Sequence, residues 1–183
     1  VSLNPTVGDV PGNGQKIVCF TQDAIAKGCL LVIFPEMALL GYPPKDLIRC
    51  EIFLERQNQV LNQLKRLSKK ITIIVGGFLR HSGKGPPFQN VAFIFKNGQK
   101  EVYAKRLLPN YDVFDERRYF AAGKKPVELR LGKLRFRLSI CEDMWFDEPK
   151  VKNFYDSSIK NDLLKMHPDF VINISASPFE RDK

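Results

Sequence analysis

The sequence has no long hydrophobic run and few residues of the kinds that bind metals or form disulfides. No stretch approaches the roughly 18 consecutive apolar residues that a transmembrane helix needs. The first residues, VSLNPTVGDV, lack the basic segment and apolar core of a signal peptide. The four cysteines show no CxxC spacing, which favours reduced thiols. The two histidines are far apart, so no zinc site is expected. We therefore expect a cytoplasmic protein without a bound metal or a membrane contact.

The composition is that of a globular protein with an excess of positive charge. Hydrophobic residues make up 44% and charged residues 27% of the 183 residues, enough for one domain with a sizeable core. The net charge of +9 raises the question of nucleic acid. The basic residues are spread over short clusters, such as 64–70 and 133–137, and accompany no RNA-binding or helix-turn-helix pattern. A solvated basic surface, or one that faces an acidic partner, is favoured over nucleic-acid binding.

Hydrophobic periodicity predicts helices and buried strands that alternate along the chain. Helices are predicted at 15–28, from about 46 to 67, and around 157–166. The inward face of the first is expected to hold Ile17, Cys19, Phe20, Ala24 and Ile25. Apolar runs predict buried strands at 30–34, 71–79 and 169–175. Hairpins are predicted over 91–105, around an Asn97-Gly98 turn, and over 127–140. This mixture favours an α/β fold with mixed sheets flanked by helices.

Reactive polar residues follow three of these predicted strands. Glu36 follows the run at 30–34, Lys105 ends one hairpin, and Cys141 ends the other. Because ligands bind at strand ends in such sheets, the three side chains are expected at one edge. There they would act as a general base, a cation for a developing oxyanion and a thiol nucleophile with an exposed sulfur. Each residue alone is weak evidence, since a lone glutamate or lysine after a strand is usually solvated. Their combination favours an active site.

Three long segments carry a resemblance to a known family. LVIFPEMALLGYPPKDL (31–47), YAKRLLPNYDVFDERRYF (103–120) and ICEDMW (140–145) resemble the nitrilase superfamily, whose members hydrolyse or transfer carbon–nitrogen bonds with a Glu–Lys–Cys triad. GYPPKDL, LPNYDVFDERRYF and the opening LNPTVGDVPGN are, more narrowly, similar to the glutaminase domains of glutamine-dependent NAD synthetases. The resemblance covers nearly the whole chain and implies a nitrilase-type α-β-β-α sandwich.

The resemblance also implies roles for individual residues. Glu36 would be the general base, Lys105 the oxyanion-stabilising cation and Cys141 the nucleophile. A second set of residues would bind the substrate near this triad: Glu116, Tyr111, Glu142, Ser177 and Lys183. Within this set, Glu142 is expected to meet the ammonium group of glutamine, while Ser177 and Lys183 hold its amino-acid end. Asp112 departs from the family pattern, because a glycine is common beside the tyrosine.

The function implied by the resemblance is the supply of ammonia. Residues 1–183 would form a nitrilase-like glutamine amidohydrolase domain that is incomplete at both ends. It would hydrolyse L-glutamine through a cysteine thioester, and the ammonia would serve the ATP-dependent amidation of deamido-NAD to NAD. The sequence contains no SGGxDS loop for ATP, so ATP and magnesium are expected in a synthetase domain outside this chain. No cofactor is expected in this domain, and a homo-oligomer is expected.

Two alternatives stay open from the residues alone. Another nitrilase-type amidase or carbamoyl hydrolase would keep Glu36, Lys105 and Cys141 but act on a different substrate. A basic binding module without activity would need none of the three, and the intact triad argues against it.

Overall fold

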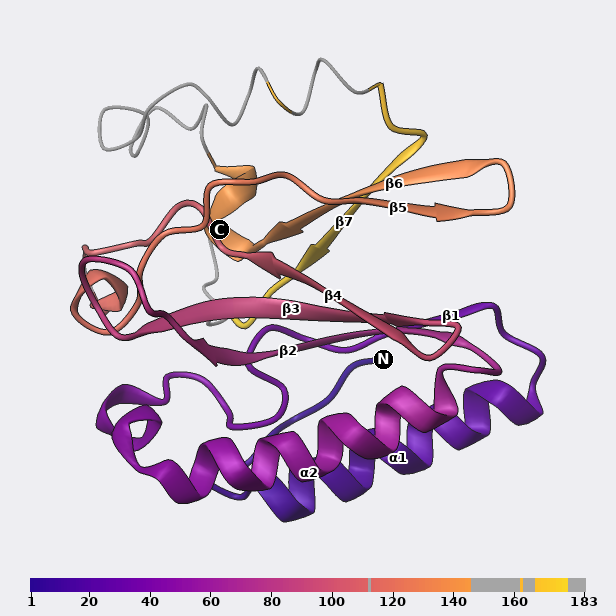
Figure 1. Cartoon of the computed structure of the whole chain (residues 1–183), viewed down its shortest axis with the longest axis horizontal. Helices are drawn as coiled ribbons and strands as arrows, with labels where there is room; N and C mark the ends of the chain where they lie inside the picture. The colour runs from indigo at the N-terminus through magenta and orange to yellow at the C-terminus, as the bar shows by residue number, and fades with distance from the viewer. Residues whose placement is uncertain (112, 146–161, 163–166, 178–183) are drawn as a thin grey trace, which may run out of the picture.

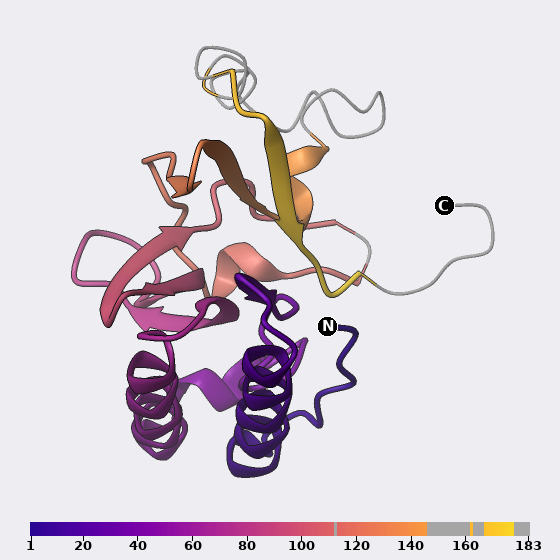
Figure 2. The same cartoon turned by 90° about the vertical axis from the view of Figure 1, so that its right-hand side faces the viewer.

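The protein is built from two β-sheets packed face to face, with two helices against the outside of one sheet. The computed structural model describes residues 1–111, 113–145, 162 and 167–177. The first sheet has the order β1 (Leu31–Ile33), β2 (Thr72–Arg80), β3 (Phe88–Lys96), β4 (Gln99–Ala104), and the second has the order β5 (Glu128–Leu131), β6 (Leu134–Ile140), β7 (Phe170–Ile174). Helices α1 (Val10–Ala26) and α2 (Glu51–Leu67) lie side by side beneath the first sheet (Figures 1 and 2). The α/β class with mixed sheets and flanking helices is confirmed.

Both sheets contain parallel and antiparallel neighbours, as their connections require. β1 runs parallel to β2 across the α2 connection, and β6 runs parallel to β7. The β3–β4 and β5–β6 pairs are antiparallel hairpins. Asn97 (φ 51°) and Gly98 (φ 75°) both adopt the left-handed conformation that a two-residue hairpin turn needs. Both predicted hairpins are therefore confirmed.

Side chains alternate between the two faces of the first sheet, so the interior is divided into two cores, one on each face. Ile73 and Val75 of β2 pack in the core that includes Leu64 of α2, whereas Ile74 packs in the core between the sheets. The second core also contains Ile94 of β3 and apolar residues of β6 and β7. Successive side chains of a strand point to opposite faces, so a strand covered on both faces reads as a continuous apolar run.

The inward face of α1 differs from the predicted one. The structure exposes Cys19 and Phe20, and the buried residues of the helix are Val10, Asn13, Gly14, Ile17 and Thr21. Asn13 is buried because its side chain bonds the backbone of Thr6 and Leu39. Gly14 is buried because it packs directly against α2. A Cβ at this position would lie only 2.4 Å from Val60. The prediction is therefore confirmed for Ile17, Ala24 and Ile25, which pack in or against the core, and it is wrong for Cys19 and Phe20.

The second sheet ends in a strand that is only partly buried. Phe170 and Val171 of β7 are 54% and 43% exposed, so the prediction of a fully buried strand at 169–175 is wrong for this half. Among the described strands, β7 lies at an edge of its sheet, where Ile172 and Ile174 face the core. The helix predicted around 157–166 lies outside the described residues except for Asp162. None of the described helices has the length and apolar character to cross a membrane.

Candidate active site

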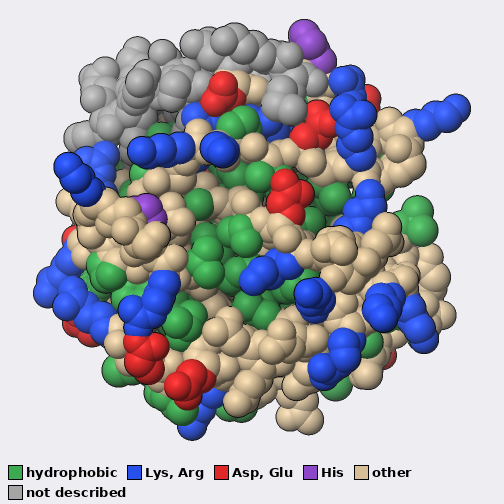
Figure 3. All heavy atoms as spheres, viewed as in Figure 1, with side chains coloured by type: hydrophobic (Ala, Val, Ile, Leu, Met, Phe, Trp, Pro, Cys, Tyr) green, Lys and Arg blue, Asp and Glu red, His purple; other side chains and the backbone are tan. Residues whose placement is uncertain are grey.

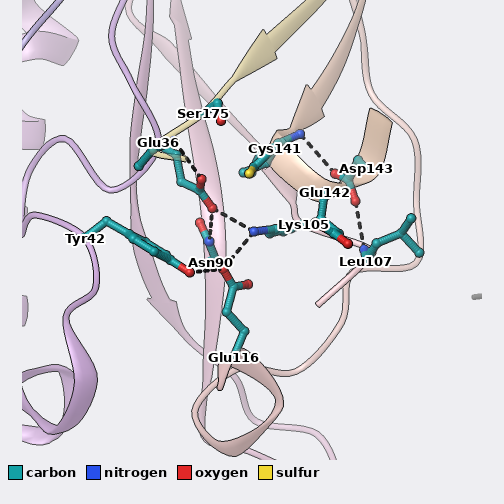
Figure 4. Close-up of polar contacts among 12 residues, drawn as sticks. Glu36, Tyr42, Asn90, Lys105, Leu107, Glu116, Cys141, Glu142, Asp143 and Ser175 are labelled. Atoms are coloured by element: carbon teal, nitrogen blue, oxygen red, sulfur yellow. Dashed lines mark hydrogen bonds and ion pairs between the residues drawn. The ribbon is translucent and has the colours of Figure 1, made fainter. Parts of the chain in front are cut away.

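Glu36, Lys105 and Cys141 come together between the two sheets, at the ends of strands from both (Figure 4). Glu36 follows β1, Lys105 follows β4, and Cys141 follows β6 directly. Lys105 Nζ lies 2.8 Å from Glu36 Oε1 and 2.8 Å from Glu116 Oε1. The structure therefore groups the predicted triad with the second glutamate.

Lys105 is buried between the two carboxylates, and this arrangement sets the charges of the cluster. Burial by itself would lower the pKa of Lys105, but Glu36 and Glu116 raise it well above its usual value. Burial raises the pKa of Glu116 to about 7, against the opposing effect of Lys105. Glu116 Oε1 also accepts a hydrogen bond of 2.9 Å from the Tyr42 hydroxyl. The lysine therefore stays charged, while Glu116 can take up a proton near neutral pH.

Cys141 is held in a strained and sheltered position. Its φ of 44° lies in the left-handed region, which is uncommon for a residue with a side chain. The residue is only 5% exposed, so the expectation of an exposed thiol is wrong. The segment after β7 covers it, with Ser177 Oγ 3.3 Å from the sulfur. Burial raises the pKa of the thiol, and the nearby Glu36 raises it further, so the sulfur is protonated at neutral pH.

The predicted substrate-binding residues fall partly within the described structure. Glu142 is 4% exposed, and its Oε1 accepts a 2.7 Å hydrogen bond from the Tyr111 hydroxyl. This carboxylate is therefore buried beside Cys141 and is not a solvated surface group. Ser177 lies against Cys141, as described above. Lys183 and Asp112 lie outside the described residues.

Asn90 is a member of the cluster that sequence reasoning missed. Its Nδ2 donates to Glu36 Oε1 at 2.7 Å, and the backbone N–H of Ala176 donates to Glu36 Oε2 at 3.1 Å. Both oxygens of Glu36 are thus held in place by hydrogen bonds. Asn90 lies in β3 and is 1% exposed, and its own Oδ1 has no partner among the described residues. The signal available in the sequence is an asparagine inside an otherwise apolar strand, FQNVAFIF.

Asp143 is a second missed residue, and it joins the Lys105 segment to the Cys141 turn. Its Oδ1 accepts from the backbone N–H groups of Arg106 (3.0 Å) and Leu107 (2.8 Å). Its Oδ2 accepts from the Tyr103 hydroxyl (2.7 Å) and from Ile140 N (3.0 Å). Asp143 is fully buried, and burial raises its pKa despite these bonds. The two adjacent carboxylates after Cys141 therefore differ: Glu142 bonds the Tyr111 hydroxyl, and Asp143 links two strand ends.

The Glu36 turn depends on a glycine in the neighbouring strand. Met37 has a φ of 51°, which turns the chain sharply after Glu36. Gly76 of β2 lies so close to this turn that a Cβ there would be 2.4 Å from Pro35 O and 2.5 Å from Met37 N. Only a residue without a side chain allows this approach.

Comparison with known proteins gives the same family over most of the chain. Residues 1–156 match the carbon–nitrogen hydrolase family. A glutamine-dependent NAD(+) synthetase of Synechocystis sp. is 38% identical over 188 residues, covering 99% of this chain and 34% of that protein. One from Aquifex aeolicus is 32% identical, covering 99% of this chain and 30% of that protein. This chain therefore spans about a third of the length of the curated relatives it matches.

Solved structures agree with the sequence comparison. A glutamine-dependent NAD+ synthetase from Acinetobacter baumannii, solved with adenosine diphosphate, has a TM-score of 0.84 at 30% identity, covering 97% of this chain and 32% of that chain. A nitrilase-superfamily amidase from Nesterenkonia has a TM-score of 0.76 at 17% identity, covering 98% of this chain and 64% of that chain. The amidase likeness shows the fold alone. Since the family match spans most of its residues, this chain belongs to the carbon–nitrogen hydrolase family.

Proposed function

We propose that this chain is a glutaminase domain, in which Cys141 attacks the side-chain amide of glutamine. The observation that carries the proposal is the buried Lys105 between Glu36 and Glu116, next to a cysteine at a strand end. This grouping supplies a nucleophile, a base and a fixed cation in one water-poor site. The names of the relatives at 38% and 32% identity support glutamine as the substrate.

The first step forms a thioester and releases ammonia. The sulfur of Cys141 attacks the amide carbon, and the thiol proton passes to Glu36. Because burial keeps the thiol protonated, a base must take this proton as the bond forms. Glu36 then gives the proton to the departing nitrogen, the carbon–nitrogen bond breaks, and ammonia leaves. The product on the enzyme is a γ-glutamyl thioester.

The second step returns the enzyme to its starting state. Water loses a proton to Glu36 and attacks the thioester, and the thiolate leaves and regains the proton, which releases glutamate. In both steps a negative charge develops on the carbonyl oxygen. Lys105 donates two of its three N–H groups to the carboxylates, and the remaining one can stabilise this oxygen. The backbone N–H after Cys141 is the second donor in this scheme.

Glutamine carries an ammonium and a carboxylate that the pocket must pair. We assign the ammonium to Glu142, whose carboxylate Tyr111 orients through a 2.7 Å hydrogen bond. We assign the carboxylate of glutamine to Ser177 and Lys183. A charged pocket of this kind would separate glutamine from simple aliphatic amides, which lack both groups.

The remaining steps belong to a longer protein. Ammonia would pass to a second site that amidates deamido-NAD, with ATP and magnesium, in a synthetase domain beyond residues 1–183. A homo-oligomer and a cytoplasmic location stay predictions from the sequence.

Labelling with a glutamine-like diazo-ketone, followed by mass spectrometry, tests the proposal. Label should fall on Cys141, be prevented by glutamine, and vanish in Cys141→Ala. Cys19, Cys29 and Cys50 are exposed, so a general thiol reagent should label these three first and serves as the control. Label on them with Cys141 untouched would overturn the assignment. Ammonia release from aliphatic amides at the rate seen with glutamine would favour a simple amidase instead.

A further inference from the structure

A cavity lined by basic side chains borders the Lys105 segment, but none of Glu36, Lys105 and Cys141 is among its lining residues. Its volume is about 720 Å³, and Lys84, Arg106, Arg117 and Lys124 line it together with His81. No aspartate or glutamate is among the described residues that line it. Basic side chains are also more frequent than acidic ones on the face of the molecule in Figure 3. These cations come from separate parts of the chain, so the fold gathers them around one space.

Backbone hydrogen bonds build this cavity from two glycine- and lysine-containing loops. The loops are HSGKGPP (81–87) and FAAGKKP (120–126). The first is closed by a bond from His81 N to Pro87 O at 2.8 Å. The second is fixed by Ala121 N, which donates to Phe88 O at 2.7 Å, and by Gly123 N, which donates to Lys105 O at 2.7 Å. The two loops are therefore positioned before any ligand arrives, which lowers the entropic cost of binding.

Two of the cations around the cavity, Lys84 and Lys124, have no ion-pair partner among the described residues. Arg106 pairs with Asp162 at 2.8 Å, and the Arg117 Nε donates to Leu108 O at 3.3 Å. Like charges that share a cavity repel one another, and an anion between them would offset that cost. Phosphate groups suit lysine and arginine because they accept several charge-assisted hydrogen bonds.

The cavity also has an apolar wall, which a purely solvated basic surface would lack. Pro86, Leu108 and Phe120 line it, and Leu108 and Phe120 are otherwise buried. A volume of about 720 Å³ lies within the range of about 300–1,000 Å³ that holds small molecules. We propose that this cavity binds a small molecule with two or more phosphate groups joined to an apolar or aromatic ring, of which a nucleoside diphosphate is the type. This site does not depend on the reaction proposed for Cys141.

Photolabelling with an azido-adenine analogue of ADP tests the site, because peptide mapping shows where the label falls. Label is expected in residues 81–90 or 106–125, in a saturable manner, with competition by ADP and by pyrophosphate but not by adenosine. The variant Lys84→Gln/Lys124→Gln removes two charge-assisted contacts and should weaken this labelling at least about tenfold.

A charge-matched control separates the site from the general positive field of the protein. Lys16→Gln/Lys133→Gln removes the same charge at exposed positions outside the cavity and should leave labelling within about twofold. Circular dichroism checks that both variants are folded. The proposal is overturned if neither segment is labelled, if adenosine competes as well as ADP, or if the control weakens labelling as much as Lys84→Gln/Lys124→Gln.

Discussion

Lys105 is the residue on which the electrostatics of the site depend. Its side chain is 1% exposed, and its ammonium contacts two carboxylates at 2.8 Å each. A buried ion pair contributes little net stability, but removal of one partner leaves uncompensated charge in the interior. If Lys105 has the role proposed above, activity and folding are therefore linked at this position.

Lys105→Met should lose both functions. Turnover of glutamine should fall by roughly a hundredfold or more, because the proposed oxyanion donor is removed. The free energy of unfolding should fall by about 3–5 kcal/mol, because Glu36 and Glu116 lose their cation. Urea unfolding and ammonia release measure the two effects, and Lys16→Met at an exposed site is the control. Near-normal turnover in a folded Lys105→Met protein would contradict the role of Lys105.

The raised pKa of Glu116 predicts that the stability of the folded protein depends on pH. Its pKa in the folded state is about 7, above the ordinary value of 4.5, so between these values the folded protein binds more protons than the unfolded one. The contribution of Glu116 to stability is therefore greatest below about pH 4.5 and falls as the pH rises to 7. Over this interval the loss amounts to roughly 2–3 kcal/mol.

Glu116→Gln removes the titrating group and should flatten this part of the stability profile. Denaturant unfolding of both proteins at pH 5 and pH 7 measures the difference. An equal change in the wild-type protein and in Glu116→Gln would show that another group carries the pH dependence.

At the scale of elements, the site depends on how closely neighbouring backbones approach. β2 passes so near the Glu36 turn that Gly76 has no room for a side chain. The neighbouring Gly77 faces the other way, where a Cβ would be 2.4 Å from Gln57 Oε1 of α2. The two glycines thus contact different layers.

Gly76→Ala should therefore impair activity more than Gly77→Ala. Either change should destabilise the protein by about 1–3 kcal/mol through overpacking. Only Gly76→Ala displaces Glu36, so kcat should fall about tenfold or more in that variant and stay within about threefold in Gly77→Ala. Equal kcat values in the two variants would show that the position of Glu36 does not depend on Gly76.

Asp143 couples the end of β4 to the end of β6 through four hydrogen bonds. Asp143→Asn places an amide nitrogen among N–H donors, which should cost about 1–3 kcal/mol of stability for each donor left unpaired. The Lys105 segment would also move relative to Cys141, so kcat should fall more than KM changes. Tyr103→Phe removes a single bond to Asp143 and should cost only about 1 kcal/mol. If both variants lower kcat equally, the backbone bonds of Asp143 do not position the site.

At the scale of the whole molecule, the site is shared between two sheets. Glu36, Asn90 and Lys105 belong to the first sheet or its ends, and Cys141 belongs to the second. The core that contains Ile94 holds the sheets together, whereas the core that contains Leu64 holds the helices on. The position of Cys141 relative to Glu36 is therefore expected to depend on the first of these cores.

Two matched large-to-small substitutions, one in each hydrophobic core, test this dependence. Ile94→Ala and Leu64→Ala each remove buried methyl groups and should each cost about 2–5 kcal/mol. Ile94→Ala should also lower kcat by roughly tenfold or more, since the sheets can shift, while Leu64→Ala leaves kcat of the folded protein nearly unchanged. A larger kcat loss in Leu64→Ala would contradict this division. Activity is measured at a temperature where both variants are folded.

Turn residues and hydrophobic periodicity predicted much of the secondary structure, because both depend on the backbone conformation of a few neighbouring residues. The Asn97-Gly98 turn, the strand at 71–79 and the helix ending near residue 67 appear in the structure. The run at 30–34 forms only the short strand Leu31–Ile33, and Leu30 is 79% exposed. The grouping of Glu36, Lys105 and Cys141 was also predicted, since each follows a strand. Their roles in catalysis remain a prediction that the labelling and turnover experiments address.

The sequence by itself determined which elements form and which reactive groups stand at their ends, because turn residues and periodicity act over a few neighbouring residues. Only the tertiary structure decided that Cys141 is sheltered, that Asn13 and Asn90 face inward, and that Asp143 links the ends of two strands. Each of these depends on a partner group from a distant part of the chain. A buried polar residue is stable only when it forms hydrogen bonds with such a partner. The local sequence pattern does not show which distant group will lie within hydrogen-bond distance.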